Sequence, residues 1–264
     1  MYITKTYKGK KIYYMDSRNY NNAFAVLSSS SKLAPLSSLS YDIDKSKYRE
    51  VARVNCSLFD YNTKRALGWE YSDLFKTTSS NEYKEVIHFK DGTYMFGDVS
   101  PRSVNLNNIK WAYSGSHVVL QDGKDVCLCP SWRTQYTTGA YCWSFFATRG
   151  DGSFVIGAVD ANHTITTDEL REFLKALNCT NAMINDGGGS AEFIYDGKVI
   201  NRAKSNERSI ANGLFVYEEI KSSSSSTTST STHDHTNCLN EINQLKKENE
   251  RLQTIINEVK DLVD

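Results

Sequence analysis

Short hydrophobic runs separated by Asp-Gly pairs fill the first 221 residues of the chain. Val118–Leu120 precedes one pair, and Phe154–Val159 follows another. Asp-Gly readily supplies the positive φ angles that tight hairpin turns require. Four pairs have such flanks: Asp91-Gly92, Asp122-Gly123, Asp151-Gly152 and Asp196-Gly197. The pattern therefore predicts mixed, largely antiparallel sheets assembled from hairpins.

One helix is predicted clearly, and it makes the expected fold class α+β with few helices. Thr166 and Glu169 form the sequence signature of a capping box. Apolar residues then follow at helical spacing, namely Leu170, Phe173, Leu174 and Leu177. Asn178 suits the left-handed turn that ends a helix. We expect Ser28–Ser40 to form a loop and a shorter helix to lie near Tyr48.

The composition changes sharply after residue 221, which predicts a domain boundary there. Residues 1–221 form the expected catalytic-type domain, and 222–237 form a linker. Eleven consecutive Ser and Thr residues, Ser222 to Thr232, offer no side chains for a core. Residues 238–264 follow as a C-terminal coiled-coil helix without Gly or Pro.

Heptad spacing over residues 239–264 predicts self-association. The a positions are Ile242, Asn249, Ile256 and Val263, and the d positions are Leu245, Leu252 and Val259. Ile255 and Leu262 widen the apolar stripe, which favours a homotrimer over a dimer. The alternative is a single amphipathic helix that packs back onto the domain.

Charge and hydropathy exclude two classes of partner. The 31 basic and 31 acidic residues balance, whereas nucleic-acid binders usually carry a basic excess. No run of 18 apolar residues occurs, so no membrane span is expected. The first residues lack an apolar signal-peptide core, so we expect synthesis in the cytoplasm. The six cysteines include no CxxC pair and are interpreted as reduced thiols.

The loop Asn185–Ser190 is the outstanding local feature. Ala182–Ile184 before it and Glu192–Tyr195 after it are each predicted to be short strands. Gly187, Gly188 and Gly189 allow a sharp turn whose N–H groups could bind an anion. Asp186 is placed to act as an acid, a base or a ligand of a divalent cation. A plain glycine turn capped by Asp186 is the alternative.

Three further side chains are candidates for chemistry. Asp160 ends the hydrophobic strand Phe154–Val159 and stands shortly before the predicted helix. Arg133 and Arg208 could each bind a phosphate group through two N–H donors. The alternatives are a turn residue for Asp160 and ordinary surface positions for the two arginines.

Five stretches, in order along the chain, carry a resemblance to a known family. They are Asn55–Asp60, Ser131–Thr134, Asp160 with Thr166–Leu170, Ile184–Ser190, and Arg208–Gly213. They resemble the phosphodiester glycosidase family, whose loop reads Asp-Gly-Gly-Gly-Ser and whose first motif carries two glycines where this chain has Cys56 and Ser57. The similarity extends from Val51 to Tyr217.

The resemblance implies hydrolysis of a sugar-1-phosphodiester at its glycosidic bond. It implies catalytic roles for Asp186, Asp160 and Asn55. It implies substrate-binding roles for Arg133, Thr134, Asn185, Gly187, Gly188, Gly189, Ser190, Arg208 and Asn212. No cofactor follows from it, although a divalent cation on Asp186 and the phosphate remains open.

The linker and heptads add an expected biological setting. With a phosphorylated glycan as substrate, they suggest a phage or prophage protein, associated with the virion, that acts on a bacterial surface polymer. The alternatives are a non-catalytic oligomeric glycan-binding protein and a structural virion component on the same fold.

Overall fold

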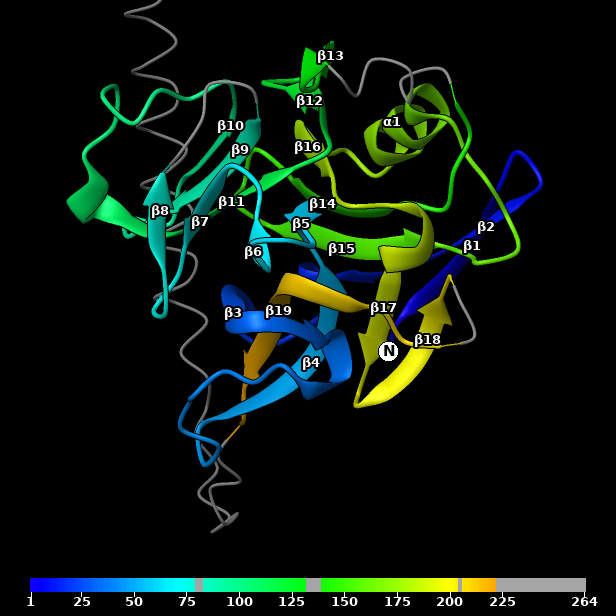
Figure 1. Cartoon of the computed structure of the whole chain (residues 1–264). Helices are drawn as coiled ribbons and strands as arrows, with labels where there is room; N and C mark the ends of the chain where they lie inside the picture. Colours follow the sequence, from blue (N-terminus) through cyan, green and yellow to red (C-terminus); the bar gives the residue numbers. More distant parts are fainter. Residues whose placement is uncertain (79–82, 132–138, 204–205, 222–264) are drawn as a thin grey trace, which may run out of the picture. The chain divides into compact units, whose positions relative to one another are not determined.

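The computed structural model describes residues 1–78, 83–131, 139–203 and 206–221 (Figure 1). The predicted linker and coiled-coil helix, 222–264, lie outside these residues, as do Arg133 and Thr134. Every strand pair among the described residues is antiparallel. With a single α-helix in this part of the chain, the α+β prediction is confirmed for the domain.

A seven-stranded sheet, sheet I, carries the helix. Its strands in spatial order are β1 (Ile3–Tyr7), β2 (Lys10–Asp16), β15 (Phe154–Val159), β14 (Ser144–Thr148), β16 (Asn181–Ile184), β12 (His117–Gln121) and β13 (Lys124–Leu128). Helix α1 (Thr167–Ala176) buries Leu170, Phe173 and Leu174 against it. The Phe173 ring meets the rings of Tyr14 and Phe145 edge to face.

Two five-stranded sheets complete the domain. Sheet II contains β10 (Tyr94–Gly97), β9 (Lys84–Phe89), β11 (Ile109–Gly115), β7 (Trp69–Tyr71) and β8 (Lys76–Thr78). Sheet III contains β18 (Lys198–Arg202), β17 (Glu192–Tyr195), β4 (Tyr48–Asn55), β19 (Ser209–Glu219) and β3 (Phe24–Pro35). A small pair joins β5 (Phe59–Asp60) to β6 (Arg65–Ala66). The 3-10 turns are η1 (Ser17–Asn19), η2 (Leu36–Ser38), η3 (Leu106–Asn108) and η5 (Gly188–Ser190).

The main core lies where the three sheets meet. Phe146 and Met183 from sheet I, Trp111 from sheet II, and Val54 and Leu214 from sheet III belong to one buried cluster. Burying apolar side chains of this size stabilises a fold by about 1.5–3 kcal/mol each. The sheets are therefore held by a shared interior, which fixes the strand ends that form the site.

The predicted hairpins and helix are confirmed. Each of the four Asp-Gly pairs connects two antiparallel neighbours: β9 and β10, β12 and β13, β14 and β15, and β17 and β18. Thr166 caps α1 in a full capping box with Glu169, and Asn178 adopts a φ of 61° after the helix. These features depend on neighbours in sequence, so the local pattern is sufficient to specify them.

Two local predictions were wrong. Most of the expected loop Ser28–Ser40 is strand, because β3 continues to Pro35 in pairing with β19. The expected short helix near Tyr48 is strand β4, which pairs with β19 and with β17. In both cases long-range pairing overrides local preference. Within the described residues, no helix is long and apolar enough to cross a bilayer.

Candidate active site

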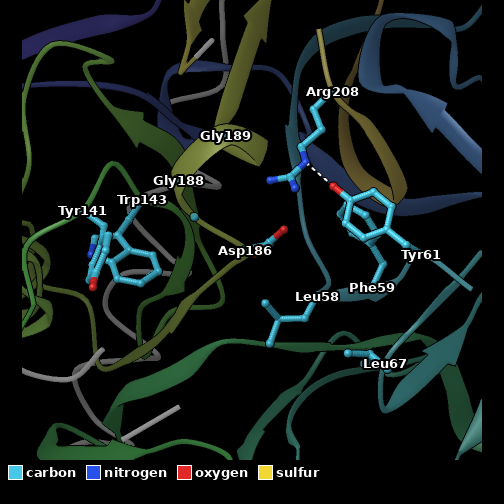
Figure 2. A pocket seen from close by; sticks show the side chains of 11 residues that line it. Leu58, Phe59, Tyr61, Leu67, Tyr141, Trp143, Asp186, Gly188, Gly189 and Arg208 are labelled. Carbon is cyan, nitrogen blue, oxygen red and sulfur yellow. Dashed lines mark hydrogen bonds between the residues drawn. The ribbon is translucent and has the colours of Figure 1, made fainter. Parts of the chain in front are cut away.

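A cavity of about 340 Å³ opens where β16 ends (Figure 2). Four separate parts of the chain form it: the β5–β6 region, the segment before β14, the glycine loop after β16, and the approach to β19. The lining residues are Leu58, Phe59, Tyr61, Leu67, Tyr141, Trp143, Asp186, Gly187, Gly188, Gly189 and Arg208. The predicted residues Asp186, Gly187–Gly189 and Arg208 therefore share one cavity.

The backbone of Asp186 is held firmly at the cavity. Its N–H donates to the carbonyl of Cys56 at 2.8 Å. Its carbonyl accepts from Asn55 Nδ2 at 2.8 Å and from Ser144 Oγ at 3.3 Å. The carboxylate points into the cavity, toward the side occupied by Arg208 and Tyr61 (Figure 2). The loop thus presents the carboxylate while the main chain stays fixed.

Three predicted asparagines, Asn55, Asn185 and Asn212, support the cavity from behind, each at most 1% exposed. Asn55 also accepts from the N–H of Glu192 at 3.0 Å. Asn185 donates to the Asn55 carbonyl at 2.8 Å and accepts from the Tyr113 hydroxyl at 2.8 Å. Asn212 accepts from the Ser57 N–H at 3.0 Å. All three therefore position the loops, and none lines the cavity.

Close packing against Trp143 requires a glycine at one position of this loop. A Cβ on Gly187 would lie 2.2 Å from a ring carbon of Trp143, so only glycine fits there. Gly188 has a φ of 58°, and its N–H donates to the Cys142 carbonyl at 2.8 Å. The sequence predicted that the backbone N–H groups of all three glycines could bind an anion. This prediction is wrong for Gly188, because its N–H already donates to a carbonyl of the protein. The predicted residue Ser190, at the end of this loop, is buried.

Arg208 supplies the positive charge in the cavity. Its Nε donates to the Tyr61 hydroxyl at 2.6 Å, and its Nη1 lies 3.4 Å from Ser190 Oγ. The guanidinium also lies over the rings of Phe59 and Tyr61, at 5.7 and 5.4 Å from their centroids. These contacts orient a cation at the cavity wall, and phosphate binding by Arg208 stays a prediction from the sequence.

An aromatic wall faces Arg208 across the cavity, and the sequence reasoning did not identify it. Tyr141 and Trp143 meet edge to face, with ring centroids 5.2 Å apart. The indole N–H of Trp143 donates to the Ile165 carbonyl at 3.0 Å, which fixes the ring. In Figure 2 the pair lies on the opposite side of Asp186 from Arg208 and Tyr61. The alternation Tyr141-Cys142-Trp143 before a buried strand was the available signal.

Asp160 does not line this cavity; its carboxylate is part of a separate hydrogen-bonded cluster. It accepts from the Tyr13 hydroxyl at 2.6 Å and the Asn162 N–H at 2.9 Å, and His163 Nδ1 lies at 3.2 Å. Burial alone would raise the pKa of Asp160, but these hydrogen bonds outweigh burial and lower the pKa. Asp160 is therefore a buried ionised residue with its oxygens occupied.

The described residues include no cluster of side chains that would support a metal site. Across the described residues, no three His, Cys, Asp or Glu side chains gather into a set that could hold a metal ion. A divalent cation between Asp186 and a substrate phosphate stays a prediction from the sequence.

Comparison with models of protein families shows which family this chain belongs to. The model of the phosphodiester glycosidase family matches residues 48–217. The chain belongs to the phosphodiester glycosidase family. The match extends from β4 to β19 and includes every residue that lines the cavity. Comparison with curated protein sequences finds no match.

Solved structures show the same fold as this phosphodiester glycosidase domain. The catalytic domain of zebrafish N-acetylglucosamine-1-phosphodiester alpha-N-acetylglucosaminidase, auto-inhibited by its pro-peptide, has a TM-score of 0.63 and 17% identity, covering 81% of this chain and 80% of that one. A hypothetical protein from Synechocystis has a TM-score of 0.64 and 10% identity, covering 82% of this chain and 61% of that one.

Proposed function

We propose that the protein hydrolyses the glycosidic bond of sugar-1-phosphodiesters in the cavity between Asp186 and Arg208. One observation carries the proposal: a carboxylate and a guanidinium share a cavity that also has an aromatic wall. Membership of the phosphodiester glycosidase family supports the reaction type. The three groups match the three parts of such a substrate: the anomeric carbon, the phosphate and the sugar ring.

Arg208 is assigned to the phosphate. Tyr61 and Ser190 engage its Nε and Nη1, so the guanidinium is oriented before substrate binds. The Nη2 group takes part in neither of these two bonds, and we assign it to a phosphate oxygen. Orientation in advance reduces the entropy lost on binding. A charge-assisted hydrogen bond here also stabilises the phosphate as negative charge accumulates on it during bond cleavage.

Asp186 is assigned to the anomeric carbon. Water attacks this carbon, the bond to the phosphate oxygen breaks, and the phosphomonoester leaves with the electron pair. Asp186 either takes the proton of the attacking water, with inversion, or first attacks the carbon itself, with retention. A phosphate leaves readily without protonation, so a second carboxyl acting as general acid is not required. The carboxylate also stabilises the positive charge of the oxocarbenium-like transition state.

Tyr141, which is half-buried, is assigned to the sugar, and the buried Trp143 ring packs against it. The apolar face of a pyranose ring stacks on aromatic side chains. The Trp143 ring is only 1% exposed and is held by its bond to Ile165, so it supports the Tyr141 ring from behind. The sugar then lies on one side of Asp186 and the phosphate on the other, with the scissile bond between them. This orientation follows from the opposite placement of the aromatic pair and Arg208 (Figure 2).

The proposed setting is a phage or prophage protein acting on a bacterial surface glycopolymer. Its support is the Ser/Thr segment Ser222–Thr232 followed by the heptads of 239–264. These would join three catalytic domains, as a homotrimer, to a virion. Three linked sites on one repetitive polymer would raise the avidity of binding.

The test uses the full chain and a polymer of sugar-1-phosphodiester repeats, with a small sugar-1-phosphodiester alongside. Glycosidic cleavage releases a reducing sugar and leaves a phosphomonoester on the other product. NMR of the first-formed anomer then assigns inversion or retention. Release of sugar 1-phosphate would instead indicate cleavage on the other side of the phosphorus. Tight binding without any product would favour the non-catalytic glycan-binding alternative.

A further inference from the structure

A second cavity, of about 370 Å³, lies on sheet III at the start of β4. Its walls include Tyr41, Tyr48 and Tyr217, and we call it the tyrosine cavity. It shares no lining residue with the cavity around Asp186. Its volume equals or exceeds that of the candidate active site, so it can hold a ligand of comparable size.

The tyrosine cavity is preformed by a single arginine. Arg53 Nη1 donates to the carbonyls of Leu36 and Leu39, both at 3.0 Å. Its Nε and Nη2 donate to the Glu50 carboxylate at 2.6 and 2.8 Å, and its guanidinium lies 4.2 Å from the Phe215 ring centroid. Arg53 thus fixes the segment after β3 to the face of sheet III. A wall held in this way does not have to be ordered when a ligand binds.

The walls suit a sugar ring. Tyr41 and Tyr217 have ring centroids 6.2 Å apart, and Ile43 adds apolar surface to the same cavity. Aromatic side chains with hydroxyl groups offer an apolar face for the C–H side of a sugar and hydrogen bonds at their rim. Burial, together with a hydrogen bond to Asp73, raises the pKa of Tyr41 to about 12, so this hydroxyl keeps its proton.

The charge at the rim indicates an anionic ligand. Arg49 is paired with Glu218, and Arg53 is paired with Glu50. Lys45 also lines the cavity and is exposed, and it forms no ion pair with any described residue. Its ammonium group is therefore the lining cation that can pair with an incoming phosphate.

Strand β4 connects the two cavities. Tyr48 begins the strand at the tyrosine cavity, and Asn55 ends it with its bond to the Asp186 backbone. Seven residue steps at about 3.3 Å each give a separation of roughly 23 Å along the strand. Phe59 of the candidate active site packs on the same apolar cluster as Tyr41 and Tyr217. A polymer of a few sugar phosphates is long enough to reach from one cavity to the other.

We propose that the tyrosine cavity is a secondary binding site for an anionic glycan, which holds a second unit of the polymer whose linkage is cut at Asp186. The choice of ligand rests on the proposed function. The first bound unit makes binding of the second intramolecular, which raises the effective concentration of polymer at the active site.

The test compares two charge reversals on the same loop in the full chain. Lys45→Glu changes a lining residue, whereas Lys47→Glu makes the same change two positions away, outside the lining. Both are made in the Asp186→Asn background, so that the probe, an oligomer of about ten N-acetylglucosamine 1-phosphate repeats, is not consumed. Calorimetric titration should give a Kd about tenfold weaker for Lys45→Glu and within about twofold of the parent for Lys47→Glu.

A parallel assay separates this site from the proposed function. With Asp186 intact, Lys45→Glu should hydrolyse a small sugar-1-phosphodiester at the parent rate. Equal oligomer affinity in the two charge variants would overturn the secondary site even if hydrolysis is observed. Lys45-dependent binding in a protein that hydrolyses neither probe would support the secondary site and refute the proposed reaction.

Discussion

Two aspartates at neighbouring strand ends have opposite surroundings. Asp160 follows β15, and Asp186 follows β16 after one further residue. Both strands pair antiparallel with β14, so they run parallel to each other, and both aspartates follow strands that finish at the same end of sheet I. Yet Asp160 is surrounded by hydrogen-bond donors, whereas Asp186 lines a cavity. A carboxylate at the end of a buried strand is therefore not sufficient evidence of a catalytic role.

The residues that follow each aspartate explain the difference. After Asp160 the chain turns directly toward α1, and the Asn162 N–H and His163 ring bend back onto its carboxylate. After Asp186 the glycines bring the chain against Trp143, with no side chain of their own to cover the carboxylate. The turn after Asp160 folds back onto its own aspartate, whereas the glycine turn after Asp186 lines a cavity that can hold a ligand.

Asp186→Asn should have the largest effect on activity. It removes the charge that attacks or activates water, and a group in this role usually contributes 10²–10⁴-fold, so we expect a loss of about 10³-fold in kcat. The measurement is reducing-sugar release. The backbone bonds of residue 186 do not involve its carboxylate, so the loop should keep its position, and thermal unfolding checks that the variant is folded. Retained turnover would move the chemistry away from this loop.

Arg208→Gln should have the next largest effect. Loss of a charged hydrogen bond to phosphate costs about 1.5–3 kcal/mol, which corresponds to roughly a 10- to 100-fold loss of kcat/KM. The loss should be much smaller when an uncharged aryl glycoside replaces the phosphodiester. Arg208→Lys keeps the charge and should recover part of the activity. An equal loss on both substrates would contradict phosphate binding.

Asn55→Ala should affect stability and activity together. The side chain donates to the Asp186 carbonyl in a partly buried bond and accepts from the Glu192 N–H in a buried one. The variant leaves the Glu192 N–H without this acceptor, and the Asp186 carbonyl keeps only the longer bond from Ser144 Oγ. A lost bond of this kind costs about 1–3 kcal/mol, so the free energy of unfolding should fall by about 2–4 kcal/mol. Urea denaturation gives this value. Activity should fall about tenfold, chiefly through kcat, because the loop loses its fixed position.

Asp160→Asn should have the smallest effect on activity, within about twofold of the parent. Its effect should appear in stability instead. The lowered pKa means that ionised Asp160 stabilises the fold above the ordinary pKa of 3.8, and that this contribution is lost as the pH falls through the lowered pKa. The stability gap between parent and variant should be about 1–2 kcal/mol at pH 7. It should narrow as the pH falls below 3.8 and close once the pH is below the lowered pKa of Asp160.

Urea denaturation at pH 7 and pH 3 measures that gap. If Asp160→Asn loses most of its turnover while its stability is unchanged, then Asp160 and Asp186 do not differ in their roles as we propose. The same result would return Asp160 to the catalytic role that the family resemblance implies.

The fold was predictable where its causes are local. Asp196-Gly197, for example, takes φ values of 50° and 69°, the conformation of a tight hairpin, as its two residue types favour. The strand at Tyr48 was not predictable in this way. It exists because β17 and β19 pair with it, and these strands lie more than a hundred residues further along the chain.

The sequence predicted the charged residues of the site, but it did not predict the aromatic residues that form the cavity wall. Asp186 and Arg208 stood in recognisable motifs, and both line the cavity. Asn55, Asn185 and Asn212 stood in the same motifs, but their side chains bond to the loops behind it. A motif marks residues that the site needs, and it does not distinguish contact with a ligand from support of a loop.

The sequence by itself determined the hairpins, the capped helix and the glycine loop, because each depends on residues that are close along the chain. Only the tertiary structure decided which groups share a cavity. The bond from Asn55 to Asp186 spans 131 positions, and the bond from Arg208 to Tyr61 spans 147. Such contacts arise from the packing of three sheets on one core, and local residue preferences contain no information about that packing.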